Sequence, residues 1–195
     1  MPQAPSLRPW VRITFLGWLL GIVLVVALAL TGEMAGVHGS QIAVGLGMGL
    51  GVGVAQERAL RPLLGPSQSW RWVSTFGLAL PFLLVDIARL LGFQPPYSLY
   101  GAVAVAGVSA GIGQAALLRG RPVSAPLWVL ASAIGWSAAA ALVAAADTLT
   151  RESTLRGLPG ALLYLGIVGA GGVVLGLVTS LPLRPLAEEV ASEGR

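Results

Sequence analysis

The sequence predicts an all-α integral membrane protein whose six transmembrane helices form three tandem helical hairpins. The first observation is composition: 55% of the 195 residues are hydrophobic and 10% are charged, whereas soluble domains carry about 25% charged residues. The second is length, because six apolar stretches each approach the roughly 20 residues that a helix needs to cross a bilayer. The third is an internal repeat of about 60 residues. This composition excludes an ordinary soluble enzyme and a nucleic-acid-binding domain.

The six apolar stretches are expected to be helices. Unpaired backbone groups are not tolerated in lipid, and a transmembrane barrel would need an alternation of apolar and polar residues that this sequence lacks. The expected spans are 13–30, 42–60, 72–91, 99–118, 127–146 and 161–181.

Arginine predicts the orientation. The chain has a net charge of +4, and cytoplasmic loops of membrane proteins carry an excess of basic residues. Both termini are therefore expected in the cytoplasm. That face would hold Arg8, Arg12, Arg58, Arg61, Arg71, Arg119, Arg121, Arg184 and Arg195, and the opposite face Arg89, Arg151 and Arg156 beside Glu33, Asp86, Asp147 and Glu152.

The first span has an alternative interpretation as a cleavable signal peptide. Arg8 and Arg12, an apolar run and then Ala27-Leu28-Ala29 are typical of such a segment. Its membership in the internal repeat favours a retained span.

The repeat pairs a tryptophan-led helix with a helix of the pattern G-x3-G-x2-[QT]-x3-L-R. Three units are expected, at about 10–67, 70–122 and 128–187 of a single membrane domain, 1–195, on the repeat criterion. The helices of the first kind begin at Trp10, Trp70 and Trp128, and the pattern of the second kind occurs as Gly49, Gly53, Gln56, Leu60, Arg61, as Gly107, Gly111, Gln114, Leu118, Arg119 and as Gly172, Gly176, Thr179, Leu183, Arg184.

Each part of the pattern has a physical reason. Glycines four apart lie on one helix face and admit a neighbouring backbone, while Gln or Thr supplies a hydrogen bond between helices. The arginines and tryptophans are expected to anchor the protein at the cytoplasmic interface, the latter as an aromatic belt.

The second expected span carries glycines on two faces. Gly45, Gly49 and Gly53 lie on one side, and Gly47 and Gly51 lie roughly opposite. A helix that is thin on two sides is expected to pack between two partners, so the even-numbered helices are the candidates for the inside of the bundle. Whether the hairpins form a pseudo-threefold bundle or a linear row stays open.

These tandem helices resemble an uncharacterised group of bacterial polytopic membrane proteins, over roughly residues 10–187. In that group the stretch after Gln often reads Gln-Trp-x-x-Leu-Arg, whereas here Glu57 follows Gln56 and Ala115 follows Gln114. The resemblance implies the repeat fold and a bacterial cytoplasmic (inner) membrane, and it implies no activity.

No set of residues predicts catalysis or metal binding. Ser109 lies in a G-x-S-x-G sequence typical of hydrolases, but the single His38 lies in an expected loop, so Ser109 is interpreted as a small packing residue. Glycine-rich residues 45–49 lack the preceding strand of a dinucleotide-binding loop. Glu33 and His38 are too few ligands for a structural metal. No cofactor is expected, and cysteine is absent.

Several polar residues fall within or beside the spans. Asp86 and Arg89, after Pro81, are interpreted as an interfacial ion pair, with a proton or cation site as the alternative. Gln56, Glu57 and Arg58 are expected to break the second helix and to meet Arg61 and Arg119. Residues 147–156 are expected to form a solvated turn, and 187–195 a short tail.

The predicted function is a non-enzymatic scaffold or accessory subunit of a larger membrane complex, with lipid and other integral membrane subunits as partners and no nucleic acid. The alternative is a small-molecule transporter or substrate-binding membrane subunit, whose sites usually lie near the bilayer midplane. A central cavity lined by Gln56, Gln114, Thr179 or Asp86 would favour transport.

Overall fold

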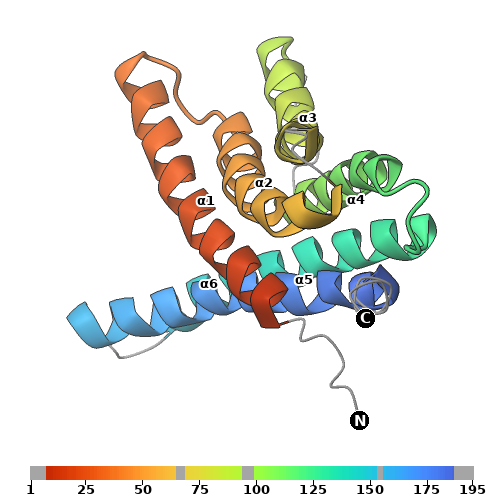
Figure 1. The fold of residues 1–195 in the computed structure, drawn as a ribbon. Helices are drawn as coiled ribbons and strands as arrows, with labels where there is room; N and C mark the ends of the chain where they lie inside the picture. The colour runs from red at the N-terminus through yellow and green to blue at the C-terminus, as the bar shows by residue number, and fades with distance from the viewer. Residues whose placement is uncertain (1–7, 65–68, 94–98, 153–155, 187–195) are drawn as a thin grey trace.

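The computed structural model describes residues 8–64, 69–93, 99–152 and 156–186. Within these residues the chain forms six α-helices and one short 3-10 helix, without strands (Figure 1). The elements are α1 (Arg8–Met34), α2 (Ile42–Leu64), α3 (Ser69–Leu90), α4 (Leu99–Leu117), α5 (Ala125–Glu152), α6 (Gly157–Ser180) and η1 (Leu181–Leu183).

Five of these helices, all but α2, are long and apolar enough to cross a membrane. The apolar part of α2 is interrupted by five glycines, which add little hydropathy, and is followed by Gln56, Glu57 and Arg58. The five apolar helices indicate a multi-pass membrane protein whose surface contacts the lipid bilayer.

The six helices form a closed ring in which each packs on its neighbours in the chain and α6 packs on α1. Consecutive helices run antiparallel. Gly17 of α1 approaches Ala55 of α2 while Gly21 approaches Met48, so these two helices run in opposite directions. The same holds where α6 meets α1, because Gly172 approaches Trp18 and Gly176 approaches Val11. The starts of α1, α3 and α5 therefore lie at the same end of the bundle as the ends of α2, α4 and α6.

Helix α2 packs between α1 and α3, as its two glycine faces predict. A Cβ on Gly49 would lie 2.6 Å from the Cα of Thr75 in α3, and a Cβ on Gly47 would lie 2.6 Å from the backbone nitrogen of Val25 in α1. Any side chain at these positions would collide with backbone, so the glycines set how closely α2 approaches its partners.

Two hydrophobic clusters fill the interior. One lies along the middle of the ring and includes Trp18, Phe82 and Trp136, with contributions from all six helices. The other surrounds Trp10, Trp70 and Trp128 at the end where the odd-numbered helices begin, which we call the tryptophan end.

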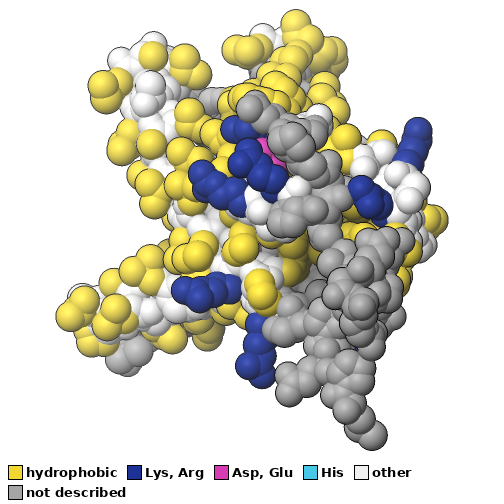
Figure 2. All heavy atoms as spheres, viewed as in Figure 1, with side chains coloured by type: hydrophobic (Ala, Val, Ile, Leu, Met, Phe, Trp, Pro, Cys, Tyr) yellow, Lys and Arg dark blue, Asp and Glu magenta, His cyan; other side chains and the backbone are white. Residues whose placement is uncertain are grey.

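Toward the opposite end the hairpins diverge, and the arms of α1–α2 and α5–α6 point in different directions (Figure 1). The outer parts of the helices expose large apolar side chains there, as the yellow spheres of Figure 2 show. Examples are Leu30 in α1, Leu90 in α3 and Leu162 in α6. The bundle is thus tightly packed at the tryptophan end and spread at the other.

Two helices continue through residues where the sequence predicts a break or a turn. Helix α2 is not broken at Gln56, Glu57 and Arg58 but continues to Leu64, because Gln56 and Glu57 find partners on neighbouring helices. The expected solvated turn at 147–156 is wrong over its first part: α5 is helical to Glu152, and Asp147 accepts a hydrogen bond from Tyr164 of α6.

Candidate functional site

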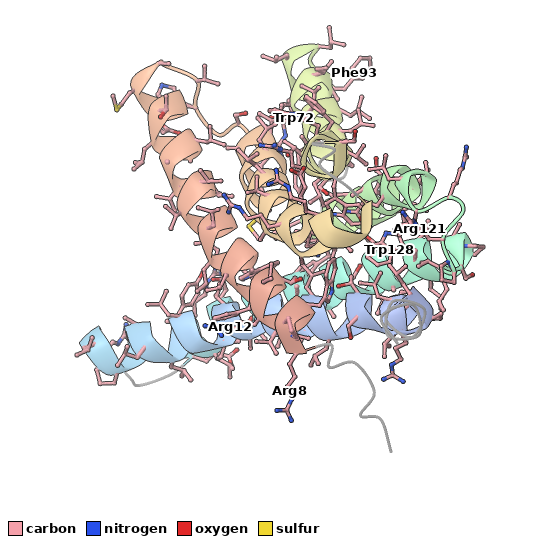
Figure 3. The ribbon with its side chains drawn as sticks, in the orientation of Figure 1. Arg8, Arg12, Trp72, Phe93, Arg121 and Trp128 are labelled. Carbon is pink, nitrogen blue, oxygen red and sulfur yellow. The ribbon has the colours of Figure 1, made fainter. Side chains whose placement is uncertain are left out.

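A buried arrangement of polar side chains surrounds three tryptophans at the tryptophan end. Trp10, Trp70 and Trp128 are 6%, 2% and 1% exposed. The Trp128 ring lies between the other two, with ring centroids 6.3 Å from Trp10 and 5.6 Å from Trp70, both edge to face. These indoles therefore lie inside the bundle and do not form the lipid-facing aromatic belt that the sequence analysis expects. Trp72, two residues after Trp70, is by contrast about half exposed, at 47%. Figure 3 labels both Trp72 and the buried Trp128.

Each of the three indoles donates a hydrogen bond to the Gln or Thr of the repeat pattern on an even-numbered helix. The Nε1 of Trp70 lies 3.3 Å from Oε1 of Gln56, and the Nε1 of Trp128 lies 3.1 Å from Oε1 of Gln114. Trp10 completes the set by donating to Oγ1 of Thr179 at 3.1 Å. The three bonds join α3 to α2, α5 to α4 and α1 to α6, so they bridge the same three helix pairs that the glycine pattern marks.

The amide nitrogens of the two glutamines also bond to hydroxyl groups on the preceding helix of the same hairpin. Nε2 of Gln56 lies 3.4 Å from Oγ1 of Thr14, and Nε2 of Gln114 donates to Oγ of Ser74 at 2.8 Å. Thr179 lacks an amide and instead donates to the carbonyl of Leu175. Among the described residues every buried side-chain nitrogen or oxygen has a partner. The network holds helices together and uses its donors and acceptors internally.

The glycine pairs of the even-numbered helices face the following odd-numbered helix, or α1 in the case of α6. Gly53, Gly111 and Gly176 each approach the residue that follows the leading tryptophan. A Cβ on these glycines would lie 3.1, 3.1 and 2.9 Å from the Cα atoms of Arg71, Val129 and Val11 respectively. The other member of each pair, Gly49, Gly107 or Gly172, approaches Thr75, Ala133 or Trp18. We call these three helix contacts the α2–α3, α4–α5 and α6–α1 seams.

The α2–α3 seam alone contains a buried acidic residue among the described residues of the three seams. Glu57 is 7% exposed, and its Oε1 lies 3.3 Å from Nη2 of Arg71. Its Oε2 accepts from the backbone nitrogen of Arg71 at 3.1 Å and from Nε at 3.3 Å. The partner of Glu57 is thus Arg71, in place of the expected Arg61 and Arg119.

At the opposite end of the α2–α3 seam, Asp86 joins α3 to the start of α2. Its carboxylate accepts hydrogen bonds from the backbone nitrogens of Gln41 and Ile42 at 2.8 and 2.9 Å, and from Oγ of Ser40 at 2.9 Å. A carboxylate at a helix N-terminus satisfies amides that have no partner within the helix. Asp86 of α3 therefore caps α2, and Arg89 lies one turn later on α3.

The remaining arginines of the repeat pattern lie on the surface at the tryptophan end. Arg61, Arg119 and Arg184 are exposed, and Figure 2 shows Arg side chains in separate groups over this face. Two surface grooves open beside them. One runs between α4 and α5 and ends at Arg119; the other runs between α6 and α1 and is lined by Arg8, Arg12 and Arg184.

The loop after α1 contains the remaining polar pair. Nδ1 of His38 lies 2.6 Å from Oε2 of Glu33, and both side chains are more than half exposed. Over residues 8–64, 69–93, 99–152 and 156–186 no three His, Cys, Asp or Glu side chains gather as metal ligands would.

The partners of the buried polar residues differ from those that the sequence predicts, although the sequence contains a signal for them. Gln56 and Trp70 are 14 residues apart, and so are Gln114 and Trp128. The same separation joins Glu57 to Arg71. A recurring separation across two short linkers indicates contact between the helices on either side.

Comparisons with protein-family models, with curated proteins and with solved structures find no match to this chain.

Proposed function

We propose that this protein is a non-enzymatic integral membrane scaffold or accessory subunit of a larger membrane complex. The observation that carries the proposal is the internal saturation of the polar residues inside the bundle. Gln56, Gln114 and Thr179 bind the three tryptophans and neighbouring hydroxyls or carbonyls. A transporter would be expected to present such groups to a substrate near the midplane, whereas here they join helices.

The same proposal has the chain cross the membrane six times. Helix α2 runs antiparallel to both α1 and α3, so α1 and α3 run parallel to each other. If two parallel helices both cross a bilayer, the chain between them must cross back, and α2 is the helix between them. Its low hydropathy fits this placement, because its glycine faces contact α1 and α3 and need no lipid.

Arginine supports an orientation with both termini in the cytoplasm. Of the described arginines, eight lie at the tryptophan end and three at the other. Because basic residues accumulate on the cytoplasmic side, the tryptophan end is proposed to face the cytoplasm of a bacterial cell. The eight are Arg8, Arg12, Arg58, Arg61, Arg71, Arg119, Arg121 and Arg184, and the three are Arg89, Arg151 and Arg156.

Three equivalent hairpins, as in the group that the sequence resembles, fit the geometry of the seams. Each seam repeats a tryptophan donor, a Gln or Thr acceptor and a glycine pair. A hairpin alone would leave this surface exposed, so the repeats stabilise one another as units of one bundle.

Photo-crosslinking in the native membrane tests the scaffold proposal. A photoreactive amino acid at Leu30, Leu162 or Leu165, which are about 60% exposed, is expected to give a specific and stoichiometric cross-link to another membrane protein. The matched control is Leu175, which is fully buried and should cross-link only within the chain. Cross-links to lipid alone from every exposed position, with a monomer after purification in mild detergent, would contradict the proposal.

A further inference from the structure

The α6–α1 seam opens into a surface groove of about 560 Å³ at the tryptophan end. Its apolar floor comes from both helices, with Val11 and Phe15 from α1 and Val173 and Leu177 from α6. Val173 and Leu177 are 37% and 52% exposed. The groove is therefore open to the lipid side of the bundle along its length.

The end of the groove is basic. Arg12 of α1 and Arg184 after η1 both line it and are exposed, and Arg8 adds a third cation. No acidic residue is among its described lining residues. Figure 3 shows Arg12 close to the point where α1 crosses α6, and Arg8 projecting from the first turn of α1. An apolar floor that ends in guanidinium groups is complementary to an acyl chain that ends in a phosphodiester.

The other two seams show what makes this one different. At the α2–α3 seam the residue after the tryptophan is Arg71, and its guanidinium is paired with Glu57, so charge is neutralised within the protein. At the α4–α5 seam the groove has the same volume, about 560 Å³, but Arg119 is the one basic residue among its described lining residues. Of these two grooves, as far as the described residues line them, the α6–α1 groove is the one that joins open apolar walls to two exposed arginines, Arg12 and Arg184.

We propose that the α6–α1 groove binds one anionic phospholipid from the leaflet at the tryptophan end. The headgroup phosphate lies between Arg12 and Arg184, and one acyl chain lies along Phe15, Val173 and Leu177. Basic pockets between transmembrane helices on the cytoplasmic side are known sites for anionic headgroups. The lipid would join the first and last helices, which no linker connects, and would stabilise the ring at that point.

Native mass spectrometry of the full-length protein, released from micelles with added phosphatidylglycerol or phosphatidylcholine, tests this proposal. The wild type is expected to retain one phosphatidylglycerol in preference to phosphatidylcholine. The Arg12→Gln/Arg184→Gln variant should lose affinity by about tenfold or more, because it removes both guanidinium groups that lie on either side of the headgroup phosphate. The matched control is Arg58→Gln/Arg61→Gln, which removes two cations from the same end and should keep the bound lipid.

A second variant separates a lipid site from a simple anion site. Leu177→Trp fills the apolar floor and leaves every arginine in place, so it should also prevent phosphatidylglycerol from being retained. Glycerol phosphate at millimolar concentration should not displace the lipid from the wild type. Equal retention of phosphatidylcholine, equal losses in the two double variants, or displacement by glycerol phosphate with no effect of Leu177→Trp would each overturn the proposal. Because the readout is lipid binding, it is independent of whether a partner subunit exists.

Discussion

The α2–α3 and α6–α1 seams follow one sequence pattern and are held in different ways. The α2–α3 seam is tied at both ends, by Glu57 with Arg71 at the tryptophan end and by Asp86 at the start of α2. The α6–α1 seam is tied by the indole of Trp10 on Thr179 and by Trp18, whose Nε1 donates to the carbonyl of Val168 at 3.0 Å. Glycines therefore determine which helices meet, while the polar residues around them determine how firmly the helices are held.

The largest expected effect comes from placing a side chain in the glycine contact of the α2–α3 seam. Gly49→Val places a branched side chain against the backbone of Thr75, where the Cβ alone would lie 2.6 Å from a Cα, and should cost about 3 kcal/mol of unfolding free energy. The matched control is Gly166→Val, because a Cβ there meets nothing within 4 Å; it should stay within about 0.5 kcal/mol of wild type. Denaturation in detergent, followed by tryptophan fluorescence, measures both. Equal stability of the two variants would show that the seams do not depend on close backbone approach.

The next effect comes from breaking the ion pair. Arg71→Met leaves the buried carboxylate of Glu57 without its cation and should destabilise the protein by about 2 kcal/mol, less than for a fully buried pair because Arg71 is partly exposed. Adding Glu57→Leu should recover most of the loss, since an apolar pair replaces an ionic pair at little cost. Arg58→Met, at an exposed position, is the control. A double variant that is as unstable as the sum of the two single variants would argue against a direct pair.

A smaller effect is expected at the other end of the α2–α3 seam, where Asp86 meets the start of α2. Asp86→Ala removes the acceptor for the amides of Gln41 and Ile42 and should cost about 1.5 kcal/mol, in the upper range for loss of a helix cap. Hydrogen exchange at those two amides should accelerate selectively. Asp86→Asn retains a capping oxygen and should stay within about 0.5 kcal/mol of wild type. Unchanged exchange in Asp86→Ala would remove the capping role.

The smallest expected effect is the difference in stability between two tryptophan variants, one at Trp70 and one at Trp10. Trp70→Phe and Trp10→Phe remove the same volume, but the first leaves the carbonyl of Gln56 without its donor, whereas Thr179 keeps its own bond to Leu175. Trp70→Phe should therefore be less stable than Trp10→Phe by about 1 kcal/mol, the cost of a buried acceptor left without a partner. Thermal unfolding of both variants in the same detergent measures this difference, and the opposite order would contradict the proposed ranking of the seams.

Much of the helix layout follows from the sequence, because hydrophobic length and glycine spacing are local properties. The position of α2 between two partners is an example: Gly45, Gly49 and Gly53 face α3, while Gly47 and Gly51 face α1. The extension of α5 to Glu152 does not follow from the sequence, because the charged residues from Asp147 onward predict a solvated turn, whereas Tyr164 of α6 provides a partner for Asp147.

The partners of the candidate polar residues are harder to predict, because they depend on how the hairpins pack against one another. The spacing along one helix predicts that Asp86 pairs with Arg89, three residues away, whereas its carboxylate accepts a hydrogen bond from the backbone nitrogen of Gln41, 45 residues earlier. The tryptophans read as interfacial from their position near helix starts, but their burial depends on three seams converging at one end. Such contacts are properties of the assembled ring, and no single helix contains them.

At the α6–α1 seam the ring of helices is closed by packing and not by a peptide bond. The order of the helices along the gene is therefore not dictated by their order in space at that point. A circularly permuted chain that begins with α3, runs through α6, is joined to α1 and ends with α2 should preserve all six helix contacts. In such a chain the missing covalent connection would lie at the α2–α3 seam and no longer at the α6–α1 seam.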